Sequence, residues 1–185
     1  PKIMEQTLYT ITVFTENRVG LLNQISIIFT RRKINIESLS VSPSSIKGVH
    51  KFTITAYTDL DTIQKLTKQI EKRIDVLRAY FYTDDEIVYQ EIALFKVPTE
   101  KLLAEKNLEA IIRRNNARIL EITPTYTGVA KMGHSDETEA LFNEFNVYGI
   151  SQFVRSGRVA VTKSDIEYVS DFIHEQRLRK AHINE

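Results

Sequence analysis

The chain has 185 residues, of which 42% are hydrophobic and 26% are charged, and its formal net charge is only +1. These values are ordinary for a folded protein, so they exclude a disordered chain and a nucleic-acid binder that relies on bulk charge. Because the chain has no cysteine, it has no disulfide, no thiol nucleophile and no thiolate metal ligand. No apolar run reaches the roughly 18 residues of a membrane span, and no signal-peptide pattern opens the chain. We therefore expect a cytoplasmic protein without a membrane partner.

The first pattern along the chain is a strand, a glycine turn and a helix. Apolar and polar residues alternate across residues 8–14, which is the period of a half-buried strand. From Leu21 to Phe29 the apolar residues have the i, i+3, i+4 spacing of a helix face. A helix that begins just after Gly20 presents free N–H groups and its positive dipole end to the turn. The turn is therefore predicted to bind an anion such as a carboxylate, rather than to catalyse a reaction.

The first half continues in the same order. Strands are predicted at residues 34–41 and 49–57, from their alternation and the turn-rich segment between them. A helix follows, with Asp61 as its cap and Gln64 in the capping-box position, and then a strand at residues 79–82. The resulting order, βαββαβ, predicts a ferredoxin-like sandwich of two layers.

The acidic residues 83–86 mark the predicted domain boundary, so we expect domains at 1–83 and 84–185. The second half repeats the βαββαβ order and adds a C-terminal helix. Its predicted elements are a strand at 89–97, a helix around Leu108, strands at 117–123 and 126–132, a helix from Ser135, a strand at 147–154 closed by Arg155-Ser156-Gly157, a short β-like segment at 158–162, and a final helix opened by a capping box at Ser164 and Glu167. The predicted fold class is α+β, with two ferredoxin-like α/β sandwich domains.

Patterns typical of catalysis or metal binding are missing from the sequence. The four histidines have no metal-ligand spacing, and we expect each at the surface or in a turn; they are His50, His134, His174 and His182. There is no nucleophile elbow, phosphate loop or dinucleotide fingerprint. The basic runs at 31–33 and 177–180 are more typical of helix ends than of nucleic-acid contacts. The sequence therefore predicts a binding protein with no catalytic residues and no metal site.

Several strings in the chain resemble one known family. The string Glu-Asn-Arg-Val-Gly-Leu-Leu at 16–22, followed by Asn-Ile-Glu-Ser-Leu at 35–39 and Val-Ser-Pro at 41–43, resembles an ACT domain. More narrowly, it resembles the small regulatory subunit of acetolactate synthase, also called acetohydroxyacid synthase. Further similar strings lie at 74–78, 91–97, 121–124 and 154–157. The resemblance thus covers residues 8 to 160, and the Asn-Ile-Glu-Ser-Leu string is its most specific part.

The resemblance implies a non-catalytic regulatory subunit in the biosynthesis of valine, isoleucine and leucine. Such a subunit activates a large catalytic subunit and mediates feedback inhibition by valine bound at the interface of an ACT homodimer. The resemblance also implies that thiamine diphosphate, Mg2+ and FAD belong to the catalytic partner, and that this chain holds no cofactor. The second domain has no comparable turn, and we expect it to contact the catalytic subunit. No nucleic-acid partner is expected.

The turn and the resemblance together predict a site for a free branched-chain amino acid, shared between two subunits. N–H groups around residues 19–22 are expected to bind the carboxylate, and oxygens of Asn17 and Asn35 the ammonium, while Leu21 and Ile36 pack on the aliphatic group. The full predicted set is Asn17, Arg18, Val19, Gly20, Leu21 and Leu22 of one subunit with Asn35 and Ile36 of its neighbour.

Three alternatives remain open from the sequence. Asn17 and Gly20 taken alone are more typical of a plain turn, and the family resemblance favours a ligand site instead. Asn35 by itself is equally compatible with a hydrogen-bonded polar group on an edge strand. The chain is also compatible with a stand-alone ACT sensor that regulates another enzyme or transcription, although no helix-turn-helix is visible. Leu21 is larger than the residue usual in the family, which leaves the preferred amino acid open.

Overall fold

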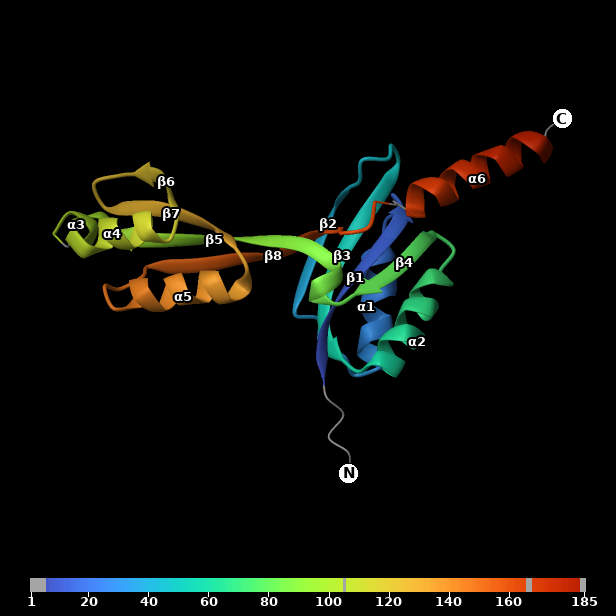
Figure 1. Cartoon of the computed structure of the whole chain (residues 1–185), viewed down its shortest axis with the longest axis horizontal. Helices are drawn as coiled ribbons and strands as arrows, with labels where there is room; N and C mark the ends of the chain where they lie inside the picture. The colour runs from blue at the N-terminus through green and yellow to red at the C-terminus, as the bar shows by residue number, and fades with distance from the viewer. Residues whose placement is uncertain (1–5, 105, 166–167, 184–185) are drawn as a thin grey trace, which may run out of the picture. The chain divides into compact units, whose positions relative to one another are not determined.

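The computed structural model describes residues 6–104, 106–165 and 168–183. It divides the chain into two compact units (Figure 1), one formed by Pro1–Val88 with Ala160–Glu185 and the other by Tyr89–Val159. The boundary expected from the sequence, between residues 83 and 84, comes before this division. The segment from Ala160, which the sequence places in the second domain, clusters with the first unit.

The first unit has the βαββαβ order that the sequence predicts. Its elements are β1 (Thr7–Glu16), α1 (Leu21–Arg31), β2 (Ser38–Pro43), β3 (Val49–Thr58), α2 (Leu60–Glu71) and β4 (Val76–Tyr82), followed by the short 3-10 helix η1 (Asp84–Glu86) and, from the end of the chain, α6 (Tyr168–Ile183). The strands form one antiparallel sheet in the order β2-β3-β1-β4. In this order β2 and β4 are the edge strands.

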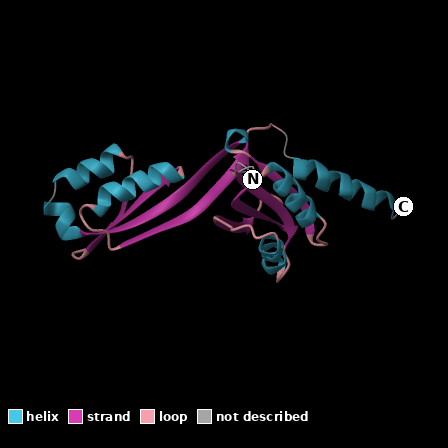
Figure 2. Ribbon diagram, turned by 90° about the horizontal axis from the view of Figure 1, so that it is seen from below, coloured by secondary structure: helices cyan, strands magenta, loops and turns pink. Residues whose placement is uncertain are grey.

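Helices α1 and α2 cover one face of this sheet (Figure 2). Strand alternation turns Ile11 of β1 and Ile54 of β3 toward the helices, and both are fully buried. They pack against the apolar stripes of the two helices, where Ile28 and Leu66 are likewise fully buried. The core of the unit is therefore a single layer between sheet and helices.

The other face of the first sheet is covered by the chain's own C-terminal segment. Val169 of α6 is buried in a cluster with Phe14 and Val49. The guanidinium of Arg78 lies 3.6 Å from the ring centre of Phe172, a cation–π contact between β4 and α6. The final helix is thus part of the first unit's packing.

The second unit repeats the sheet topology of the first. Its elements are β5 (Ile87–Pro98), α3 (Thr99–Ala104), α4 (Lys106–Arg114), β6 (Arg118–Ile122), β7 (Tyr126–Gly133), α5 (Ser135–Asn146) and β8 (Gln152–Thr162). The sheet order is β6-β7-β5-β8, with the helices on one side (Figure 2). Its core is built around Phe95 and Phe145, whose ring centres are 5.2 Å apart, and Leu108 of α4.

Several sequence expectations about element limits are wrong. The strand expected at 34–41 begins only at Ser38. The cap of α2 is Asp59, because its extended backbone lets its carboxylate accept from Thr62 N–H, while Asp61 lies in the first turn. The strand expected at 147–154 begins only at Gln152, because Gly149 makes a left-handed turn after α5. That strand then runs through the string at 155–157 instead of ending there. Helix α3 was not anticipated, and the expected cap residue Glu167 lies outside the described residues.

Among the described residues, no helix is long and apolar enough to cross a membrane.

Two glycines allow a direct test of backbone strain at the start of α1. A Cβ added at Gly20 or at Gly128 would meet no atom within 4 Å, but only Gly20 has a positive φ, of 85°. Gly20→Ala is therefore expected to lower the free energy of unfolding by about 1–2 kcal/mol, the cost of a left-handed backbone for a residue with a Cβ. Gly128→Ala, the matched control in β7, is expected not to lower it. Urea unfolding of both variants measures the difference, and equal stabilities would contradict this account of the turn.

Candidate functional site

The turn between β1 and α1 presents a helix end without a cap. Gly20 has a left-handed backbone, and the first N–H of α1 with a helical partner is that of Gln24, which donates to the Gly20 oxygen at 3.2 Å. The N–H groups of Leu21, Leu22 and Asn23 come before it. No described side chain caps this end, and the first turn contains no acidic residue. An anion would therefore find both free donors and the positive end of the dipole here.

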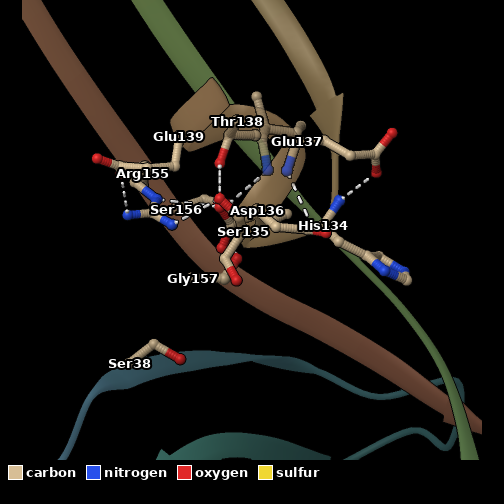
Figure 3. Close-up of polar contacts among 12 residues, drawn as sticks. Ser38, His134, Ser135, Asp136, Glu137, Thr138, Glu139, Arg155, Ser156 and Gly157 are labelled. Atoms are coloured by element: carbon tan, nitrogen blue, oxygen red, sulfur yellow. Dashed lines mark hydrogen bonds and ion pairs between the residues drawn. The ribbon is translucent and has the colours of Figure 1, made fainter. Parts of the chain in front are cut away.

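The starts of α2 and α5 are closed by side chains of these helices. At α2 the carboxylate of Asp59 accepts from Thr62 N–H at 2.9 Å and from the Thr62 hydroxyl at 2.7 Å. These two hydrogen bonds hold the pKa of the Asp59 carboxyl below its usual value. At α5 the carboxylate of Glu137 reaches back to the N–H of His134 at 2.7 Å (Figure 3). The open start of α1 therefore differs from the capped starts of α2 and α5.

The residues of the turn are exposed around this helix end. The Arg18 guanidinium lies 3.5 Å from the Glu16 carboxylate and 3.8 Å from that of Asp75, contacts that hold it against the end of the sheet. Asn17 is exposed, and Val19 is fully exposed. Of the predicted set, residues 17–20 are therefore accessible to a ligand from solvent.

Leu21 and Leu22 differ in what they offer. The Leu21 side chain is only 2% exposed and belongs to the core, so its backbone N–H is the group that faces the turn. The Leu22 side chain is 46% exposed. On the one chain described, Leu22 is thus the more accessible apolar surface at the start of α1.

Asn35 and Ile36 lie at the opposite end of the sheet from Asn17. The Asn35 amide donates to Glu37 at 3.1 Å, and Ile36 packs partly against the core. In the register, Glu16 is opposite position 49 of β3 and Ser38 is opposite position 55. Six residues of strand correspond to about 20 Å, so one chain cannot bring Asn17 and Asn35 onto one amino acid.

A buried polar pair that the sequence analysis did not single out lies beside the turn. Thr15 and His50 are directly opposite each other in β1 and β3, on the helix-covered face. The Thr15 Oγ1 and the His50 Nδ1 are buried and have no hydrogen-bond partner among the described residues. The expectation that His50 is a surface or turn residue is wrong, because it is half-buried within β3. The alternation of the strand expected at 49–57 was the signal in the sequence that His50 lies within a strand.

The other histidines do not form a catalytic arrangement. His134 is half-buried, its ring stacked on Tyr89 with ring centres 4.0 Å apart, and His174 is exposed. Ligand atoms of His134, Asp136 and Glu137 lie within 4.8 Å of one another. Since Glu137 caps α5 and lies 3.8 Å from the Lys131 ammonium, this group is explained as a helix cap. The side chain of His182 lies outside the described residues.

A second polar network, around Arg155, connects strands and a helix of the second unit (Figure 3). The Arg155 Nε donates to Glu91 at 3.0 Å, and its Nη2 donates to the Ser135 carbonyl at 3.2 Å. The Glu91 carboxylate also accepts from the Thr138 hydroxyl at 2.7 Å. These hydrogen bonds hold β5, β8 and α5 together and have a structural role. They involve residues of two strings noted in the sequence, at 91–97 and 154–157.

Comparisons with known proteins give a family match within each of the two units. Residues 11–78 match the family model described as "AHAS small subunit-like ACT domain", and residues 90–164 match "Small subunit of acetolactate synthase". Residues 165–185, which include α6, lie beyond both matches.

Similar proteins carry the same description. The acetolactate synthase small subunit of Bacillus subtilis is 33% identical over 154 residues, covering 83% of this chain and 89% of that protein. That of Aquifex aeolicus is 31% identical over 156 residues, covering 84% and 81%. The crystal structure of the small subunit from Thermotoga maritima shares the fold at a TM-score of 0.77 and 21% identity, covering 86% of this chain and 99% of that one. The chain therefore belongs to the family of acetolactate synthase small subunits, the regulatory subunits of that enzyme.

Proposed function

We propose that this regulatory subunit activates the catalytic subunit of acetolactate synthase and inhibits it again when valine binds between two ACT units. The observation that carries the proposal is the uncapped start of α1 at the exposed turn of residues 17–20. It offers N–H donors to a carboxylate in the unit that matches an ACT domain.

A second copy of the chain completes the site. β2 is an edge strand with unpaired backbone groups on its outer side. Antiparallel pairing with the β2 of a second copy reverses one chain relative to the other, so that the Ser38 end of one lies at the Pro43 end of its partner. Pro43 is opposite His50, and His50 is opposite Thr15, at the end where β1 leads to the turn. Asn35 of one copy therefore approaches the Asn17 turn of the other.

Each part of a free amino acid has a counterpart in this composite site. The N–H groups at the start of α1 bind the carboxylate, and the side-chain oxygens of Asn17 and the second copy's Asn35 bind the ammonium. Exposed Leu22 and half-buried Ile36 supply apolar contact for the isopropyl group. For a ligand of this size, about 0.7 kcal/mol per heavy atom gives roughly 5–6 kcal/mol, and hence a dissociation constant of about 0.1 mM.

Binding becomes regulation because the ligand contacts two chains. A ligand held by both copies favours the arrangement in which they are paired, and it can shift the catalytic subunit only through that difference in affinity. We assign thiamine diphosphate, Mg2+ and FAD to the catalytic partner and none of them to this chain. The same proposal places the complex in the cytoplasm.

The direct test is reconstitution with the catalytic subunit. Adding this chain is expected to raise the rate of acetolactate formation, and valine is expected to lower the rate again only when this chain is present. Isothermal titration with valine, leucine and isoleucine ranks the effectors. A rate that does not respond to the chain would overturn the proposal.

Replacement of Asn35 separates inhibition from activation. Asn35→His removes the amide oxygen and adds bulk at the predicted ammonium contact, so the valine concentration for half-inhibition is expected to rise roughly tenfold or more, with activation retained. The matched control is Asn143→His, on the exposed side of α5 in the second unit, which is expected to respond like wild type. If Asn35→His remains as sensitive to valine as the control, Asn35 is not in the site.

Mixed dimers test whether the site spans two chains. Asn17→Ala and Asn35→Ala are each expected to abolish valine inhibition when alone. In a one-to-one mixture that reassembles randomly, half of the dimers contain one chain of each kind, and each of these has one intact site. About a quarter of all sites is then restored, and inhibition returns in part. No recovery after reassembly would place both residues on the same chain's site.

A further inference from the structure

A cavity lies against the face of the first sheet that α1 and α2 do not cover, beneath the chain's own C-terminal segment. Its volume is about 310 Å³. Its lining comes mainly from β1, β3 and β4 on the sheet side and from residues 160–165 and α6 on the other, all within the first unit. Pockets for small ligands begin at about 300 Å³, so this cavity is large enough for a molecule with one ring.

Three aromatic rings form the apolar part of the lining. Phe14 of β1 and Tyr80 of β4 meet edge to face with ring centres 6.3 Å apart, and the ring centres of Tyr80 and Tyr82 are 6.4 Å apart. Ile87 and Val169 add aliphatic walls that are almost fully buried. Rings in this arrangement pack favourably on another ring or on an aliphatic group, so the occupant is expected to have an apolar body.

A half-buried cation lines the same cavity. The Lys51 ammonium donates to the Ala160 carbonyl at 2.7 Å and lies 5.7 Å from the ring centre of Phe14. These contacts hold the ammonium between β3 and the end of β8. Because an ammonium has three donors, it can bind an anion in addition to this carbonyl. The lining therefore favours a negatively charged group on the occupant.

An acidic residue of the lining, Asp165, does not cancel this preference. Asp165 is exposed, whereas Lys51 is half-buried. Water and salt screen the charge of an exposed carboxylate more strongly than that of a half-buried ammonium. The potential inside the cavity is therefore set mainly by Lys51, and an anion is favoured over a cation.

A buried hydroxyl gives a second, independent indication of a polar occupant. Thr12 lines the cavity although it is only 4% exposed, and in the register it is opposite Thr53 and Tyr80. Within the part of the chain that the structure describes, its hydroxyl makes no hydrogen bond. A hydroxyl removed from water without a hydrogen bond is unfavourable, and an oxygen of a ligand beside it would supply the partner.

Contacts within the first unit hold the outer wall of the cavity in place. The backbone N–H of Lys163 donates to the Glu86 carbonyl at 3.0 Å, and Val169 packs with Phe14 and Val49. Val169 lies beyond both family matches, which end at residues 78 and 164. The wall that α6 supplies is therefore an addition to the regions that the two family models describe.

We propose that this cavity is a second small-molecule site, for a monocarboxylate whose apolar body is about the size of one ring. The carboxylate accepts from the Lys51 ammonium and the Thr12 hydroxyl, and the body packs among Phe14, Tyr80 and Val169. None of these residues belongs to the proposed valine site, so the two sites are separate. Since the ligand contacts both the sheet and the C-terminal segment, its binding stabilises the packing of that segment on the sheet.

Titration calorimetry of the full chain with three probes that share a benzyl group tests the charge preference. Phenylacetate is anionic, phenylacetamide is neutral and benzylamine is cationic. Phenylacetate is expected to bind with a dissociation constant of about 1 mM or below, roughly tenfold tighter than the amide, and the amine is expected to bind most weakly. Equal binding of the three probes, or no binding of phenylacetate at about 10 mM, overturns the proposal.

Two substitutions in the lining test the assigned contacts. Lys51→Met keeps an unbranched stem without the charge and is expected to weaken phenylacetate binding roughly tenfold, with little effect on phenylacetamide. The matched control is Lys65→Met on α2, whose exposed ammonium pairs with Asp61. Thr12→Val keeps the volume and removes the buried hydroxyl, so it is expected to weaken phenylacetate binding roughly threefold without lowering the melting temperature. Wild-type affinity for phenylacetate in both lining variants overturns the proposal.

The valine site is kept apart from this site by a separate pair of measurements. Saturating valine and the Asn35→His variant are each expected to leave the affinity for phenylacetate unchanged. Loss of phenylacetate binding in either case would place the probe at the start of α1 and overturn the second site. Loss of the valine response with phenylacetate binding retained would instead contradict the proposed effector site alone.

Discussion

A four-stranded sheet has two faces, and in each unit of this chain the helices that connect the strands cover only one of them. The two units differ in the side chains that occupy the remaining face. In the first unit hydroxyl residues such as Thr12 and Thr53 and the packing of α6 on Phe14 make that face compatible with a single chain. In the second unit the corresponding face carries the exposed side chains of Ile92, Leu94 and Met132, with Lys96 and Arg118 on the same face.

The proposed effector site likewise depends on an element that a single chain leaves incomplete, the start of α1. Helices α2 and α5 close their first turns with Asp59 and Glu137, whereas α1 begins at left-handed Gly20 without a side-chain cap. A helix end left open costs stability unless water or a ligand satisfies its donors. Asn17 and Asn35 are separated by the length of the sheet, so the proposed site requires a second chain. Both features support the proposal that a second chain and a small molecule complete this surface.

The sequence predicted most of the first unit because its signals are local. Gly20 before an apolar helix face specifies where α1 begins, and alternation specifies β1. It failed where two local signals compete: Asp59 and Asp61 are both good caps, and only the extended backbone at position 59 decides between them. Residues 147–151 are apolar enough for a strand, but Gly149 turns the chain after α5.

Contacts between residues far apart in the chain could not be predicted from the sequence. The burial of His50 beside Thr15 depends on strand register, and the docking of α6 on the first sheet depends on contacts such as Arg78 with Phe172. Alternation in β5 predicts two faces but not whether the outer one is covered. For the candidate site, the family strings suggest the residues and their division between two subunits, and this stays a prediction, whereas their positions at opposite ends of one sheet follow from the register.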